Sequence, residues 1–185
     1  MSLAVFVFFL FLVFYSCSDT PTIVAQPGAK LLYFDLKGYF DQEVKRLADF
    51  TRVKKIATVD GQREEQTLEA HDFALDLKIF TDADINRASW SDKYVVDSVF
   101  NNQRQLVRLD YTANDMDLRT QKISIEFEEG NVSKIFIENS SSSAVADTKQ
   151  LLTYRPSSGY AIESRQKVAL SGDHVFLVEV QFLSH

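Results

Sequence analysis

The sequence predicts an α+β domain, in which two helices pack on one face of a curved antiparallel sheet made of a meander of about six strands plus an N-terminal hairpin. Three observations predict this class. Apolar residues recur at three- and four-residue steps in residues 35–50 and 72–81, which is the period of an α-helix. From about residue 93 onward the period changes to two, as in half-buried strands. The dipeptide Asp60-Gly61 separates two short strand-like runs and is a strong hairpin signal.

The first helix is expected over residues 35–50, with Asp35 as its N-cap. Its apolar face consists of Leu36, Tyr39, Phe40, Val44 and Leu47. Gly38 is the one discordant residue, because glycine inside a helix costs roughly 1 kcal/mol relative to alanine. Either Gly38 marks a close packing contact, or the helix begins after it.

The hairpin is expected to consist of residues 52–59 and 62–68. Both arms carry polar residues on both faces, so we expect them at a sheet edge or projecting into solvent. Charges on such an edge also oppose pairing with other chains.

The second helix is expected over residues 72–81, followed by a linker that contains Trp90, the only tryptophan. After it, strand-like runs recur about every ten residues with short turns between them, which is typical of an antiparallel meander. We expect the serine-rich residues 140–143 to form a polar loop within this meander.

The N-terminal segment indicates export. Residues 1–16 are uncharged and almost entirely apolar, and Cys17 is the only cysteine. The segment is shorter than the roughly 20 residues that span a bilayer, so a secretory signal fits better. A lone thiol in an exported protein invites intermolecular pairing unless it is chemically consumed. We therefore expect a signal peptide at residues 1–16, a lipid-anchored flexible tether at 17–30 and one domain at 31–185.

The junction of Ser16 and Cys17 resembles the lipobox of bacterial lipoproteins, which implies lipidation of Cys17. Ser18 beside the cysteine then implies an outer-membrane location. The Asp-Leu-Lys-Gly-Tyr-Phe segment at residues 35–40 resembles small uncharacterised lipoproteins of Gram-negative bacteria, a resemblance that implies no activity and no catalytic residues. By topology alone, the chain is also similar to periplasmic half-barrel lipoprotein carriers. The alternative is a membrane anchor or an ordinary signal peptide with an incidental cysteine.

Composition and motifs argue against several functions. The net charge of -6 disfavours nucleic-acid binding, which needs a basic surface. His71, His174 and His185 are scattered and match no metal-binding spacing. No nucleophile-elbow motif is present. We therefore expect a non-enzymatic protein without a catalytic residue, metal or cofactor.

The function expected from these observations is binding or scaffolding in the cell envelope. The partner would be an envelope protein or a glycan, bound through a strand edge or the polar hairpin, while the N-terminal lipid holds the membrane. The candidate binding residues are Lys54, Lys55, Asp60, Gly61 and Trp90. The alternative is a periplasmic carrier that holds a lipid or other hydrophobic ligand between the sheet and the helices, where aromatic residues are dense.

Overall fold

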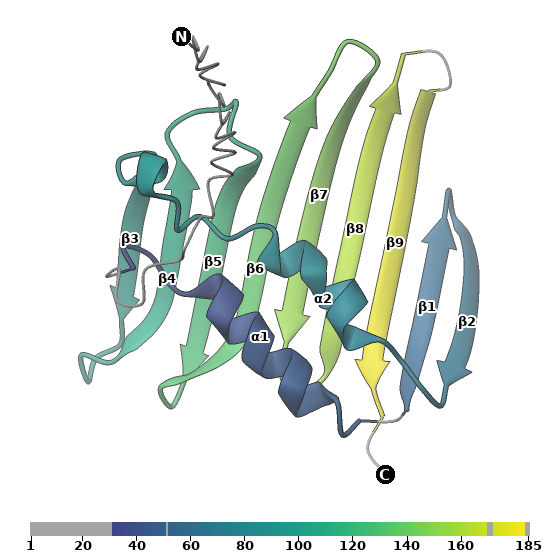
Figure 1. Cartoon of the computed structure of the whole chain (residues 1–185), viewed down its shortest axis with the longest axis horizontal. Coiled ribbons are helices and arrows are strands. Elements are labelled where there is room, and N and C mark those ends of the chain that lie inside the picture. Colours follow the sequence, from purple (N-terminus) through teal and green to yellow (C-terminus); the bar gives the residue numbers. More distant parts are fainter. Residues whose placement is uncertain (1–30, 51, 170–171, 184–185) are drawn as a thin grey trace, which may run out of the picture. The chain divides into compact units, whose positions relative to one another are not determined.

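The computed structural model describes residues 31–50, 52–169 and 172–183. The expected signal peptide, Cys17 and the tether lie outside these described residues. The elements, labelled in Figure 1, are α1 (Leu36–Leu47), β1 (Val53–Val59), β2 (Gln62–Leu68), α2 (Phe73–Thr81), the 3-10 turn η1 (Ala88–Trp90), β3 (Tyr94–Phe100), β4 (Leu106–Ala113), β5 (Thr120–Glu128), β6 (Asn131–Ser142), β7 (Ala146–Arg155), β8 (Gly159–Val168) and β9 (Gly172–Phe182).

The strands form one nine-stranded antiparallel sheet in the order β2-β1-β9-β8-β7-β6-β5-β4-β3. Strands β3 to β9 follow one another as a meander, and the β1–β2 hairpin joins it beside β9. The α+β class is therefore confirmed, but the expected count of about six meander strands was too low by one. Strand β3 lies at the sheet edge and is exposed on both faces after its first residue.

Both helices cross the same face of the sheet, which we call the helix face (Figure 1). Helix α1 begins after Asp35, whose carboxylate accepts a hydrogen bond from the Gly38 amide at 2.8 Å. A Cβ atom at Gly38 would lie 2.2 Å from Asp35 Oδ2. Glycine therefore leaves room for the capping carboxylate, and the helix includes this residue. Helix α2 has the same design, with Asp72 accepting from the Leu75 amide at 3.1 Å.

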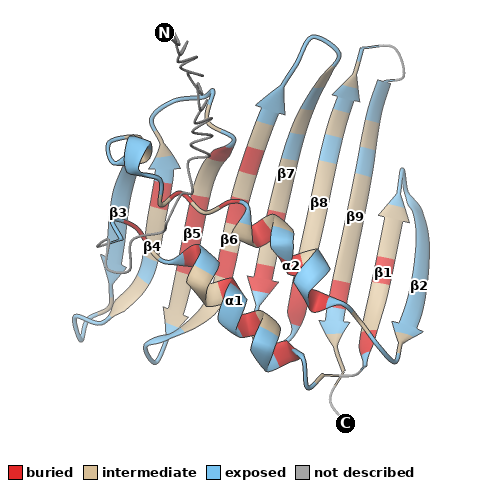
Figure 2. Ribbon diagram, viewed as in Figure 1, coloured by how far each residue is buried: buried red, intermediate tan, exposed pale blue. Residues whose placement is uncertain are grey.

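Aromatic rings fill the space between the helices and the sheet. Phe40 from α1 lies 5.0 Å from Phe80 of α2 and 5.1 Å from Tyr154 of β7, measured between ring centroids. All three side chains are fully buried. Tilted and edge-on aromatic pairs of this kind add roughly 0.5–1.5 kcal/mol beyond the burial of their surface. Figure 2 shows the buried positions of the sheet concentrated near the helices.

Strand β6 is longer than the sequence indicates. The expected polar loop at residues 140–143 was wrong for most of its length, because β6 continues through Ser142. Ser140 pairs with Lys149 of β7, and Ser142 pairs with Asp147. Serine has little intrinsic preference for strands, but β7 offers a complete ladder of backbone partners here.

Candidate functional site

The hairpin tip is tied to the neighbouring strand β9. Asp60 and Gly61 both have positive φ, at 48° and 89°, as a two-residue hairpin turn requires. The Asp60 carboxylate accepts a hydrogen bond from the Val175 amide at 2.8 Å and lies 3.0 Å from His174 Nδ1. The contact with His174, followed by that with the Val175 amide, lowers the pKa of Asp60. The predicted hairpin is thus confirmed, and its tip is held by side-chain contacts.

The two candidate lysines point to opposite faces, as alternate residues of a strand do. Lys54 forms an ion pair with Glu65 of β2 at 3.1 Å. Lys55 points to the helix face and lies 3.4 Å from Asp76 of α2. The structure therefore keeps these residues in one hairpin but pairs each cation with a different acid.

Trp90 does not join the other candidate residues. It lies in η1, next to the β3 edge, whereas the hairpin forms the opposite edge of the sheet (Figure 1). The Arg87 guanidinium lies 4.2 Å from the centre of the Trp90 ring. The five candidate residues therefore do not form one site.

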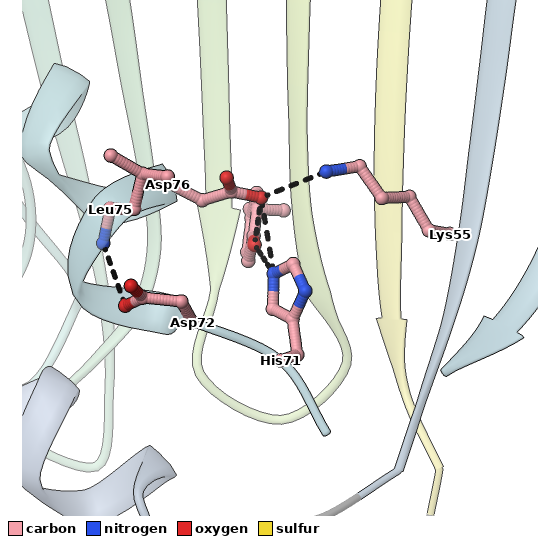
Figure 3. Close-up of polar contacts among 6 residues, drawn as sticks. Lys55, His71, Asp72, Leu75 and Asp76 are labelled. Atoms are coloured by element: carbon pink, nitrogen blue, oxygen red, sulfur yellow. Dashed lines mark hydrogen bonds and ion pairs between the residues drawn. The ribbon is translucent and has the colours of Figure 1, made fainter. Parts of the chain in front are cut away.

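A compact polar cluster holds the start of α2 on the sheet (Figure 3). Asp76 Oδ2 accepts a hydrogen bond from the Tyr160 hydroxyl of β8 at 2.8 Å. His71 Nε2 lies 3.1 Å from this same oxygen and 2.9 Å from the Tyr160 hydroxyl, and Lys55 reaches it from β1. Burial, and then the charge of Asp76, raise the pKa of Tyr160. Sequence reasoning missed this cluster, since its members meet only through the pairing of distant strands.

This cluster has the character of a structural anchor. The side chain of His71 is only 6% exposed, and its neighbours already occupy the accepting oxygen. A second anchor lies beneath α1, where the Tyr154 hydroxyl donates to Glu43 and Arg46 pairs with the same carboxylate at 2.7 Å. Within the described part of the chain, no group of three or more His, Cys, Asp or Glu side chains could hold a metal ion. The described helices include none that is both long enough and apolar enough to cross a membrane.

The two edges of the sheet differ in chemistry. The β2 edge carries the exposed charged residues Arg63, Glu64 and Glu65. The β3 edge instead exposes large apolar side chains on both faces. These are Val95, Val96, Val99 and Phe100, which are 52%, 46%, 37% and 58% exposed. Of the two edges, β3 carries a single charged residue, Asp97, in place of the run of charges on β2 that opposes pairing with another chain.

Backbone geometry shows which groups of β3 are free to pair. The Lys93 carbonyl accepts from the Asn114 amide at 2.9 Å, so Lys93 directs its carbonyl toward β4. Successive residues of a strand direct their backbone groups to alternate sides. The backbone N–H and C=O groups of Val96 and Ser98 therefore point outward, away from β4. The sequence does carry a signal for this edge, since its apolar residues at 95, 96, 99 and 100 fail to alternate.

The fold and these surfaces define a two-layer α+β protein with an open antiparallel sheet. No protein-family model matches the chain, and searches of curated proteins and of solved structures find no significant similarity.

Proposed function

We propose that this protein is a non-enzymatic lipoprotein of the outer membrane, anchored through Cys17, whose domain recruits an envelope protein by adding a strand to β3. The observation that carries the proposal is the exposed apolar edge, with the backbone groups of Val96 and Ser98 directed outward. Strand addition uses such backbone groups for affinity and the neighbouring side chains for specificity.

Charge at the β3 edge defines the chemistry of the partner strand. Asp97 lies directly opposite Asp110 of β4. Arg108 compensates Asp110 at 2.7 Å, whereas Asp97 has no ion-pair partner among the described residues. A strand with a lysine or arginine opposite Asp97 would supply the missing cation. The proposed partner is therefore an extended apolar segment with one basic residue.

The alternative carrier function has less support. A hydrophobic ligand between the helices and the sheet would have to displace Phe40, Phe80 and Tyr154, which pack against one another there. Disrupting a packed core of this kind is costly.

A pair of proline substitutions tests the β3 edge. Ser98→Pro removes an outward-facing donor without breaking a β3–β4 hydrogen bond, which edge strands tolerate. The matched control is Thr67→Pro on β2. The backbone amide of Asp60 donates to Val175 of β9, so the even-numbered residues of β1 direct their backbone groups toward β9 and the odd-numbered ones toward β2. Thr67 is paired with the even-numbered Lys54, so the backbone amide of Thr67 points outward, away from β1.

The measurement is site-specific photo-crosslinking in a Gram-negative host. A photoreactive amino acid at Val99 of the full-length protein should yield an adduct with one envelope protein. Ser98→Pro should abolish this adduct, and Thr67→Pro should leave it intact, with both variants retaining the far-ultraviolet circular dichroism of the parent. Equal adduct yield in the two variants would refute recruitment through β3.

The anchor is tested separately with Cys17→Ser. The parent protein should be processed at Cys17, carry acyl mass and fractionate with the outer membrane, since several acyl chains hold a protein firmly in a bilayer. The variant should lose all three properties. If parent and variant have the same processing, mass and fractionation, Cys17 is not lipidated.

A further inference from the structure

Beyond the helices, the two faces of β6, β7 and β8 carry different chemistry. The face opposite the helix face is charged, and includes Glu138, Asp147, Lys149, Glu163, Arg165 and Lys167. The helix face of the same strand segments carries no charge. Its residues are amides and hydroxyls, which we call the polar platform: Asn139, Ser141, Thr148, Gln150, Ser164 and Gln166.

The platform consists of two rows across three strands, and a residue of β9 ends each row. Asn139, Gln150 and Ser164 are direct partners in register, and Phe176 of β9 ends this row. The second row contains Ser141, Thr148 and Gln166 and ends at His174. The rings of His174 and Phe176 lie 6.4 Å apart, so an aromatic border adjoins the uncharged polar array. Figure 1 shows these strand segments extending past the two helices.

A hollow of about 170 Å³ lies at one end of the platform. Its lining includes Asn139, Thr148 and Gln150, together with Arg119 immediately before β5. The Arg119 guanidinium donates to Gln150 Oε1 at 3.5 Å. The lining contains amide and hydroxyl groups, which can donate or accept hydrogen bonds, a guanidinium, which only donates, and no carboxylate.

The platform also holds polar atoms that lack partners. Asn139 is 2% exposed, and neither its Nδ2 nor its Oδ1 has a hydrogen-bond partner among the described residues. The buried Ser164 Oγ, one strand further on in the same row beyond Gln150, also lacks one. Buried polar atoms are nearly always hydrogen-bonded in folded proteins, so an unmet amide and hydroxyl in one row need an explanation.

We propose that the polar platform binds a neutral oligosaccharide that carries acetamido groups. Amide side chains offer both a donor and an acceptor, and so can form paired hydrogen bonds with an acetamido group. The six platform side chains carry no charge, whereas the opposite face of the same strands is densely charged, and this contrast favours a neutral ligand. The rings of His174 and Phe176 provide an apolar border for the C–H face of a sugar ring. This site is separate from β3 and does not depend on strand addition there.

The test uses the purified full-length protein in detergent and three tetrasaccharides. The probe is the tetramer of N-acetylglucosamine, with the tetramers of glucose and of glucosamine as controls that lack the acetamido group. Titration calorimetry should detect the acetylated tetramer, with at least a tenfold weaker response to both controls. No binding of the acetylated tetramer, or equal binding of all three, would overturn the proposal.

Two variants locate the binding on the platform. Asn139→Leu removes an amide that lacks a partner, so it should abolish binding without lowering the urea midpoint of unfolding. Gln166→Glu places a charge on the more exposed row and should also weaken binding at least tenfold. The matched control is Lys149→Gln, on the opposite face of β7, which should bind like the parent. Unchanged binding in Asn139→Leu and Gln166→Glu, or self-association through this face in place of sugar binding, would refute the assignment.

Discussion

Tyr154 and Tyr160 lie directly opposite each other across β7 and β8, with their rings stacked at a centroid distance of 6.5 Å. The Tyr154 hydroxyl donates to Glu43 of α1, whereas the Tyr160 hydroxyl donates to Asp76 of α2 at 2.8 Å. A single cross-strand pair thus fixes both helices on the sheet. Each carboxylate has its own basic neighbours as well, Arg46 beside Glu43, and Lys55 with His71 beside Asp76.

The tyrosine pair predicts alkaline sensitivity. Burial, followed by the neighbouring carboxylates, raises the pKa of Tyr154 and Tyr160 above the ordinary value of 10. A phenol whose pKa is raised by folding contributes its full stability below its unfolded pKa and loses it as pH rises. We therefore expect the free energy of unfolding to fall above about pH 10.

Absorbance of the phenolate checks this expectation. In the folded protein, a fraction of the tyrosines should remain protonated above pH 10 and should ionise only as the protein unfolds. In urea, all tyrosines should titrate together. A single titration near pH 10 in the folded state would contradict the prediction.

Because Asp76 anchors α2 to the sheet, its substitution should lower stability more than substitution of another carboxylate on this helix. Asp76→Asn replaces the carboxylate shared by Tyr160, His71 and Lys55 with a neutral amide. The loss of the ion pair with Lys55 and of the charge-assisted hydrogen bonds should cost about 1–3 kcal/mol of unfolding free energy. Asp82→Asn, at the exposed end of the same helix, removes only an ion pair with Lys78 and should change stability by less than about 0.5 kcal/mol. Urea unfolding of both variants decides the point, and equal losses would show that Asp76 has no special role.

Local signals explain which parts of the fold can be read from the sequence. Asp35 and Asp72 cap the helices, and Asp60-Gly61 makes the turn, because each depends on residues within a few positions along the chain. The extension of β6 through Ser142 could not be read in this way, because it depends on pairing with β7.

The candidate sites show the same division. The two-residue period of a strand places Lys54 and Lys55 on opposite faces of the sheet, but their acidic partners come from β2 and α2. The polar platform also needs the register of three strands, since Asn139, Gln150 and Ser164 become neighbours only across them. Sequence alone places such residues on strands and cannot say which rows they form.

Two glycines with positive φ should respond very differently to alanine. Gly159 has a φ of 134°, and a Cβ there would lie 1.9 Å from the Val180 carbonyl oxygen. Gly61 has a φ of 89° with nothing within 4 Å of the added atom. Gly61→Ala should therefore cost about 1–2 kcal/mol, the ordinary penalty for a left-handed alanine. Gly159→Ala should cost more than this, roughly 3 kcal/mol or above, because the β8–β9 backbones must also separate. Thermal unfolding measures both, and equal shifts in Tm would disprove a close approach at Gly159.

The charge of Asp97 is expected to prevent two copies of the chain from dimerising through their β3 strands. Two copies of β3 that pair antiparallel around Asp97 would set Tyr94 opposite Phe100 and Val95 opposite Val99, but would also bring the two Asp97 side chains together. Like charges directly opposite each other destabilise a strand pair, so the native residue opposes this pairing.

Asp97→Asn removes the repulsion and should produce concentration-dependent dimers in analytical ultracentrifugation. Glu65→Gln on β2, where Arg63 and Glu64 remain, should stay monomeric like the parent. The second substitution Ser98→Pro should reverse dimerisation of Asp97→Asn, because it deletes an outward donor that the new pair would use. A monomeric Asp97→Asn protein would show that the apolar β3 edge is not held apart by this charge.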